Sequence, residues 1–500
     1  MQDLLGNLAM GFGVALSLQN IGLCFIGCAL GTAIGVLPGI GPLPTVALLL
    51  PFTFSLDPTG ALIMLAGVFY GAQYGGSTTA ILARLPGETS SVVTCLDGYA
   101  MALKGQAGTA LALAAIGSLL AGMVTTLLIA AAGPPLADIA LLFHSADYVS
   151  VMVLGLISAV VMAHGSVLKA LLMILLGLLL GSVGTDVATG EYRFTLGLDM
   201  LADGIGFVPI SMGLFGLAEI MINLENRGGR GVIAKAVGSL WPPLAVLRQA
   251  LPAMLRGTAI GAGFGIMPGG GPTIASFSAY SLEKKMAAQP ARFGHGAVEG
   301  VAAPEAANNA ATQSCFIPML CLGIPPNALM ALMVGAMMVH GIQPGPSIIT
   351  KQPELFWGMI ASMAVGNIIL VILNLPLIGI WVRLLQVPYA YLFPAIIVFC
   401  AVGTYTVDNS TGDVVLMAVF GVLGYVFRKL DCEPAPLMLG LVLGPLLEEN
   451  FRRAMVLADG DVTIFVTRPI SLGFLLAAAA LLAAVLLPSI RRGRQEAFRE

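Results

Sequence analysis

The sequence predicts an all-α polytopic membrane protein with about 12 transmembrane helices, additional re-entrant segments and two inverted-topology repeats. Composition is the first reason: of the 500 residues, 58% are hydrophobic and 10% are charged, and the mean hydropathy is +0.94. Soluble domains carry roughly 25% charged residues. The second reason is that long apolar runs recur along the whole chain, and the third is a glycine-proline motif that occurs once in each half. These observations exclude a soluble globular chain.

The apolar runs give the expected elements in order. The first begins near the N-terminus without a basic region before it, so we expect a retained helix rather than a cleaved signal peptide. Several runs are too short to span a bilayer at about 1.5 Å per residue, so some are expected to be re-entrant. The runs expected to cross or enter the bilayer are residues 8–36, 43–56, 59–83, 107–132, 147–163, 166–183, 205–222, 250–267, 273–282, 314–341, 355–382, 389–407, 413–428, 434–447 and 469–488.

The glycine-proline motif is the strongest internal repeat. The five letters GTAIG occur at 31–35 and again at 257–261, and each copy leads into a Pro-Gly-x-Gly-Pro run, at 38–42 and 268–272. Such a run cannot continue a helix, because proline lacks a backbone donor and glycine raises the entropic cost of order. A break inside apolar sequence is tolerated where it is buried in protein or lines a polar cavity. We therefore expect 38–42 and 268–272 to face each other near the middle of the membrane.

Further matches extend this repeat to about 230 residues. LPGE at 85–88 corresponds to IPPN at 324–327, and GGSTTAIL at 75–82 corresponds to AATQSCFI at 310–317. The chain is therefore divided into membrane repeat 1 (1–225), a cytoplasmic linker (226–249), membrane repeat 2 (250–449), a loop with a final transmembrane helix (450–490) and a cytoplasmic tail (491–500). The linker and the tail are placed in the cytoplasm because both are rich in arginine.

The two Pro-Gly breaks are the first candidate binding elements. A broken helix exposes backbone N–H groups and a partial positive charge at the new N-terminus, which favours an anion such as a carboxylate. The alternative is a pair of kinks that only help helices to pack, but matching breaks in two repeats favour a transporter binding site. The candidate substrate-binding residues in these breaks are Pro38, Gly39, Gly41, Gly269, Gly270 and Gly271.

The segments that follow each break supply the other candidate substrate ligands. Ser77, Thr78 and Thr79 form a hydroxyl-rich run before a second Pro-Gly break, and we expect them to donate hydrogen bonds to the substrate. Arg84 either faces a substrate carboxylate or extends to the membrane surface, and the sequence leaves both open. Pro325, which corresponds to Pro86 of the LPGE segment, is the candidate from the second repeat. Hydroxyl residues also hold membrane helices together, which is the structural alternative.

A third polar cluster is the candidate ion-coupling site. Glu305, Asn308 and Asn309 place one carboxylate and two amides next to an apolar segment. Their oxygens are ligands that a sodium ion prefers, whereas the alternative is a hydrated loop capped by asparagine. The four histidines are not clustered, so a histidine proton relay has little support. No catalytic or metal motif is present, the seven cysteines read as small core residues, and we expect neither an enzyme nor a cofactor, apart from a transported sodium ion.

These segments resemble a known family. GTAIGVLPGIGPLPTVALLLP (31–51), YGAQYGGSTTAILARLPGE (70–88), GFGIMPGGGPTIASFSAYSLEKK (263–285) and PEAANNAA (304–311) are similar to segments of TctA, the large membrane subunit of bacterial tripartite tricarboxylate transporters. The resemblance implies a multi-pass protein of the bacterial inner membrane. It also implies two partners, a small membrane subunit and a periplasmic solute-binding protein that delivers citrate or a related carboxylate.

We therefore expect a binding-protein-dependent secondary transporter that imports a tricarboxylate or related carboxylate, coupled to a sodium or proton gradient. One repeat is expected to move against the other to alternate access to the site. The alternative is a passive anion channel, since glycine-rich re-entrant loops also form selectivity filters.

Overall fold

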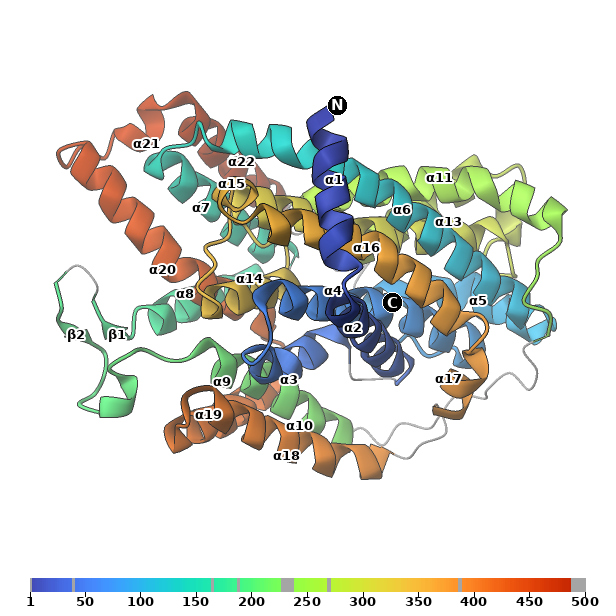
Figure 1. Cartoon of the computed structure of the whole chain (residues 1–500), viewed down its shortest axis with the longest axis horizontal. Helices are drawn as coiled ribbons and strands as arrows, with labels where there is room; N and C mark the ends of the chain where they lie inside the picture. The colour runs from blue at the N-terminus through green and yellow to red at the C-terminus, as the bar shows by residue number, and fades with distance from the viewer. Residues whose placement is uncertain are drawn as a thin grey trace.

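The computed structural model describes residues 2–37, 41–162, 166–186, 189–225, 238–267, 271–384 and 389–486, and its elements are almost all helices (Figure 1). The helices of the first half are α1 (Gln2–Ala15), α2 (Leu18–Val36), α3 (Pro42–Thr53), α4 (Pro58–Ala83), the short 3₁₀ helix η1 (Thr89–Ser91), α5 (Val92–Leu103), α6 (Ala107–Ala140), α7 (Ser145–Met162), α8 (Val167–Gly181), the 3₁₀ helix η2 (Asp199–Leu201), α9 (Phe207–Ser211), the π-helical segment η3 (Met212–Leu217) and α10 (Ala218–Glu225). Two short strands, β1 (Gly184–Thr185) and β2 (Tyr192–Arg193), form an antiparallel pair.

The second half has a similar series of elements. They are α11 (Leu244–Ile266), α12 (Gly271–Met286), the 3₁₀ helix η4 (Pro290–Arg292), α13 (Glu299–Ser314), the π-helical segment η5 (Pro318–Leu322), α14 (Ala328–Val339), α15 (Ser347–Lys351), α16 (Pro353–Asn374), α17 (Ile378–Leu384), α18 (Tyr389–Asp408), α19 (Thr411–Lys429), α20 (Pro434–Leu457), α21 (Ile464–Thr467) and α22 (Pro469–Leu486). α11 begins inside the range 226–249 that we assign to the linker, and the division into domains stays a prediction.

Two predicted segments are divided in the structure. Residues 8–36 form two helices, because Ser17 leaves the helical conformation and its side chain caps the start of α2. Residues 314–341 are interrupted by η5 and an extended turn. Here Pro318 cannot continue the regular hydrogen-bond ladder, and Gly323 adopts a left-handed conformation with φ of 73°.

Length and hydropathy support a membrane protein. Within the described residues, four helices (α2, α6, α16 and α19) are long and apolar enough to cross a bilayer. Shorter apolar helices, α3, α8 and α14 among them, accompany these four. The all-α class is confirmed, whereas the number of about 12 spans stays a prediction.

Each half contains one closely packed helix pair, α2 with α4 and α11 with α13. Glycines allow this close approach. A Cβ atom at Gly31 would lie 2.3 Å from the carbonyl oxygen of Val68, and one at Gly257 would lie 2.3 Å from the carbonyl oxygen of Ala303. Side chains at these positions would force the helices apart, as in other membrane helix pairs with small residues at their interface. The next turn repeats the contact at the second pair of matching glycines, Gly35 on Ala72 and Gly261 on Ala307.

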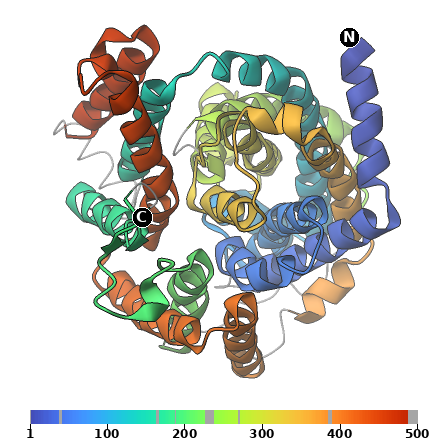
Figure 2. The same ribbon diagram turned by 60° about the vertical axis from the view of Figure 1, so that its left-hand side comes forward.

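The helices form two packed bodies that each mix the two halves of the chain. We call α1–α6 with α11–α16 the inner bundle: α6 packs on α11 and α13, and α16 packs on α2 and α4. We call α7–α10 with α18–α22 the outer arc: α8 packs on α20, and α19 packs on η3. Figure 2 shows the outer arc along the left and lower sides of the inner bundle. α3 and α14 lie at the boundary, where they contact α18, η3 and α20.

Candidate functional site

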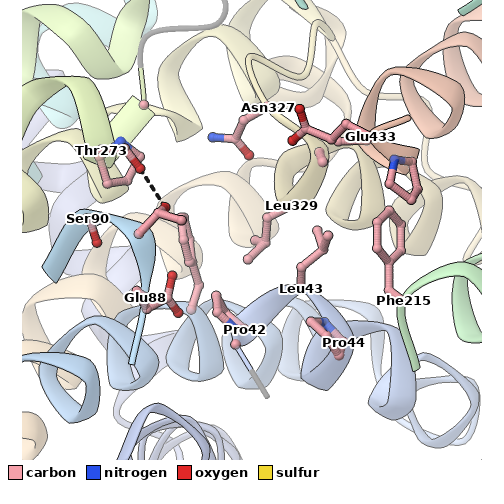
Figure 3. Close-up of a pocket in the computed structure, with 18 of the residues that line it drawn as sticks. Pro42, Leu43, Pro44, Glu88, Ser90, Phe215, Thr273, Asn327, Leu329 and Glu433 are labelled. Atoms are coloured by element: carbon pink, nitrogen blue, oxygen red, sulfur yellow. Dashed lines mark hydrogen bonds between the residues drawn. The ribbon is translucent and has the colours of Figure 1, made fainter. Parts of the chain in front are cut away.

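A cavity of about 470 Å³ lies between the inner bundle and the outer arc. This volume is within the range of small-molecule binding sites. Its wall contains the N-terminal turns of four helices, α3, α12, α14 and α20, together with η1. Figure 3 shows α3 below the cavity, Glu88, Ser90 and Thr273 on one side, and Phe215 and Glu433 on the other.

The Pro-Gly breaks place α3 and α12 at this cavity. Gly41 is the N-cap of α3 and Pro42 is its first residue, where the missing proline N–H costs no intrahelical hydrogen bond. Gly271 begins α12 with φ of 64°, a conformation that favours glycine. A Cβ atom at Gly41 or Gly271 would meet nothing within 4 Å, so the backbone is open to a ligand at both places. The described part of the two breaks therefore lines one shared cavity.

The second set of turns comes from the matching LPGE and IPPN segments. Residues 87–90 and 326–329 both line the cavity. Glu88 precedes η1, and Asn327 caps α14 by accepting a hydrogen bond from the N–H of Met330 at 2.9 Å. The hydroxyl groups of Thr89 and Thr273 lie 2.8 Å apart and connect the two halves of the wall (Figure 3). The cavity is thus built from corresponding pieces of both halves.

The charged side chains at the cavity are mostly acidic. Arg428 pairs with Glu219 at 3.2 Å, so these two charges offset each other. Glu88 and Glu433 also line the wall, and the Oε1 atom of Glu88 is buried without a hydrogen-bond partner among the described residues. The helix N-termini in the same wall contribute partial positive charges, which oppose the negative charge of carboxylates. The cavity therefore combines anion-favouring backbone with one carboxylate that has an unused oxygen.

The hydroxyl run that we predicted as substrate ligands lies behind the cavity. Ser77, Thr78 and Thr79 are buried on α4 and line none of the large cavity. Ser77 donates to the carboxylate of Glu305 at 2.5 Å, and Thr79 donates to the carbonyl of Val36 at 2.9 Å. In the structure these hydroxyls therefore make contacts within the protein.

The remaining predicted substrate residues are divided. Arg84 is exposed at the end of α4, and Pro325 is buried next to the cavity-lining Pro326, so the structure brings neither of them to the cavity wall. Four predicted residues lie outside the described part of the chain: Pro38, Gly39, Gly269 and Gly270.

The predicted ion-coupling residues lie on α13 rather than in a hydrated loop. Glu305, Asn308 and Asn309 are all buried. Glu305 accepts hydrogen bonds from the hydroxyls of Ser77 and Thr94, and Asn309 donates to the hydroxyl of Ser118 at 2.6 Å. Both polar side-chain atoms of Asn308 lack a partner among the described residues. The structure therefore brings a carboxylate and two amides into the middle of the inner bundle.

Our sequence reasoning missed several cavity residues. Thr89, Ser90 and Thr273 follow helix breaks, so their position after a Pro-Gly run was the available signal. Glu433 precedes a Pro-Ala-Pro run at the start of α20, so proline again marks the beginning of a helix. This run was not part of the repeat that we identified. Phe215, Glu219 and Arg428 have no local signal, because they reach the cavity through the packing of the outer arc.

No group of three or more metal-ligating side chains occurs in the part of the chain that the structure describes. The cysteines are free, and all but Cys432 are buried. The fold and the cavity define an α-helical membrane protein with a cavity of small-molecule size between helix N-termini from both halves.

Comparison with known proteins gives the family. A family model described as the tripartite tricarboxylate transporter TctA family matches residues 21–439, and the chain belongs to this family. It is therefore a membrane protein of the transporter class, from a system that uses further subunits.

Two curated relatives come from Agrobacterium vitis. An uncharacterized 52.8 kDa protein in the TAR-I ttuC' 3' region is 55% identical over 500 residues, the full length of both chains. An uncharacterized protein in the TAR-II ttuC' 3' region is 57% identical over 236 residues, which are 47% of this chain and 98% of the relative. No solved structure matches the chain.

Proposed function

We propose that this protein is the large membrane subunit of a binding-protein-dependent secondary transporter in the bacterial inner membrane. It imports a tricarboxylate or related carboxylate, coupled to a sodium or proton gradient. Its partners are a small membrane subunit and a periplasmic solute-binding protein. Membership of a tripartite transporter family supports the need for partners.

One observation carries the substrate class: N-terminal turns of helices from both halves line one cavity. The free N–H groups and the partial positive charge of a helix N-terminus favour a carboxylate. Proline at Pro42 and Pro272 removes some donors, but the neighbouring Leu43, Thr273 and Ile274 keep theirs. A carboxylate between α3 and α12, with a second one near η1 or α14, fits this arrangement.

The matching construction of the two halves supports an inverted repeat. The helix pairs α2–α4 and α11–α13 share the same glycine contacts, and each half supplies one Pro-Gly break and one following turn to the cavity. Transporters with inverted repeats place their substrate at the interface of broken helices in this way.

The packing favours a different moving unit from the one that we expect from the sequence. α6 and α16 each pack on the other half, and Glu305 of the second half receives hydrogen bonds from the first. Movement of one whole repeat against the other would break these buried contacts. We therefore propose that the inner bundle, which carries most of the cavity wall, moves against the outer arc.

The test is uptake of labelled citrate and other carboxylates into proteoliposomes that contain the chain with its membrane partner and binding protein. Gly41→Leu places a side chain where the protein leaves open space at the cavity. We expect it to reduce uptake at least about tenfold without loss of folded protein, because a blocked site removes well over 1.4 kcal/mol of binding.

Gly13→Leu is the matched control, because this exposed glycine of α1 also has nothing within 4 Å of its Cβ position. Normal uptake by the folded Gly41→Leu protein would contradict the site. Flux that persists without the binding protein and without any dependence on a sodium or proton gradient would instead indicate a passive anion channel.

A further inference from the structure

A small chamber lined by buried residues lies behind the substrate cavity, between α4, α6, α13 and α16. Its polar lining residues are Tyr74, Ser77, Thr78, Ser118, Glu305 and Asn374. The volume is about 10 Å³, which is room for one water-sized occupant. The two halves of the chain contribute to it together, since α4 and α6 precede the linker and α13 and α16 follow it.

The chamber wall holds oxygen atoms that the protein leaves unused. The hydroxyl of Tyr74 and the amide oxygen of Asn374 are buried and have no hydrogen-bond partner among the described residues. The amide nitrogen of Asn374 donates to the carbonyl of Leu370 at 2.9 Å, which fixes the side chain. Buried polar atoms without a partner are uncommon, so these two atoms are available to coordinate a ligand in the chamber.

The charge at the chamber is a single carboxylate. Glu305 is buried, and the structure gives it no ion pair with any described side chain. Its carboxyl group accepts hydrogen bonds from Ser77 and Thr94, which satisfy part of its lone pairs and supply no positive charge. A buried charge is costly unless an opposite charge lies close to it.

We propose that this chamber binds one sodium ion. The lining oxygens are hydroxyl, amide and carboxylate groups, which are the ligands that hard cations take. One carboxylate balances one positive charge, whereas Ca²⁺ or Mg²⁺ sites usually have more carboxylates or several waters. The chamber is lined by buried residues and has room for one small occupant, which disfavours the larger potassium ion. This assignment rests on the proposed function and adds Tyr74, Ser118 and Asn374 to the coupling residues.

The chamber is connected to the substrate cavity through two hydrogen-bonded residues. Ser77 also contacts the backbone carbonyl of Gln73 at 3.0 Å, and the side chain of Gln73 accepts a hydrogen bond from Ser90 at 2.9 Å. Gln73 and Ser90 both line the substrate cavity. A sodium ion that holds Ser77 and Glu305 in place would therefore order the turn that contacts the substrate, which couples the two sites.

The experiment uses the full chain in lipid nanodiscs, without carboxylate substrate. Sodium chloride replaces choline chloride at constant ionic strength, and the unfolding midpoint is measured. We expect the midpoint to rise with Na⁺ and to stay flat with K⁺, because a ligand that binds the folded state stabilises it. Glu305→Gln and Asn374→Ala should each raise the half-saturating Na⁺ concentration at least about tenfold.

Asn367→Ala is the matched control. Asn367 is a buried asparagine of the same helix whose amide oxygen is also unpartnered among the described residues, but it does not line the chamber. It should leave the Na⁺ response unchanged. If Glu305→Gln does not fold, the Na⁺ dependence of the unfolding midpoint is compared between Asn374→Ala and Asn367→Ala, and this comparison tests the site.

A wild-type midpoint that does not respond to Na⁺, or an unchanged Na⁺ response in both chamber variants, would overturn the sodium site. Because no carboxylate is present, this result is independent of transport. Na⁺ binding at the chamber with no carboxylate uptake would overturn the proposed function but would still support the sodium site.

Discussion

At the scale of single residues, Glu88 is the side chain that most needs an explanation. A carboxylate with a buried, unpartnered oxygen lines a cavity that we propose for an anion. Its counterpart in the repeat, Asn327, is neutral and is used as a helix cap. The two halves of the wall are therefore alike in backbone, but only the first half places an ionisable side chain at this position.

We expect Glu88→Gln to bind the carboxylate substrate more tightly above pH 8, because burial raises the pKa of Glu88 to about 8 and the side chain is mostly ionised only above that value. Two like charges about 4 Å apart in a water-like medium cost about 1 kcal/mol, so removing one should lower the KM of uptake about fivefold. Concentration dependence of uptake in proteoliposomes measures this effect. Glu354→Gln, which changes a carboxylate on α16 outside the cavity, is the control. A raised KM in Glu88→Gln would show instead that the carboxylate accepts a hydrogen bond from the substrate.

At the scale of helices, the paired glycines explain how the inner bundle is built. α2 approaches α4 so closely that the backbone of one helix occupies the space where a side chain of the other would be. The same contact recurs between α11 and α13, so corresponding glycines pack both helix pairs. The glycines of the repeated GTAIG segment are therefore packing residues, whereas the described ends of the Pro-Gly runs, residues 41–42 and 271–272, line the cavity.

We expect Gly31→Ala to destabilise the protein. Its Cβ atom would lie 2.3 Å from the carbonyl oxygen of Val68, and overpacking of this kind costs about 1–3 kcal/mol. Gly22→Ala, on the same helix with nothing within 4 Å of its Cβ, should be neutral or slightly stabilising because alanine is the better helix former. Thermal unfolding in detergent compares the two variants. An equal effect of both would show that the close approach of α2 and α4 carries no stability.

At the scale of the whole molecule, the main question is which parts move. The inner bundle is held together across the two halves by α6, α16 and the hydrogen bonds to Glu305. The boundary with the outer arc involves α3 and α14, whose N-terminal turns also line the cavity. Movement at this boundary would change access to the proposed substrate cavity while the proposed sodium chamber stays intact.

Cross-linking separates the two kinds of movement. A Cβ atom at Gly366 of α16 would lie 3.4 Å from the sulfur of Cys24 of α2, so Gly366→Cys can join the two halves inside the inner bundle. A Cβ atom at Gly216 of η3 would lie 3.9 Å from Cγ of Leu48 of α3. Cysteines at both positions, with Cys400→Ser to remove the nearby thiol, join the inner bundle to the outer arc.

We expect oxidation to leave uptake unchanged in Gly366→Cys and to abolish it in the Leu48→Cys and Gly216→Cys pair, with recovery on reduction. Uptake of labelled carboxylate before and after oxidation measures both. The opposite pattern would show that the repeats move against each other, as the sequence led us to expect.

Composition, hydropathy and motif spacing were sufficient to predict the all-α membrane class, the family and the two Pro-Gly breaks. These properties depend on residues that lie close together in the sequence. The breaks at Gly41 and Gly271 are local effects of proline and glycine on the backbone, and the sequence predicts them without tertiary information. The prediction that the two breaks lie close together came from the sequence correspondence between the two halves.

Tertiary packing decided the rest. Ser77, which the sequence predicts as a substrate ligand, is buried against Glu305 and lines the small chamber that we propose for sodium. Glu219, Arg428 and Glu433 reach the cavity because the outer arc packs beside α3 and α14, and no local pattern predicts that. The physical reason is that a Pro-Gly break is determined by neighbouring residues, whereas the partner of a buried polar group depends on which helices meet across the bundle.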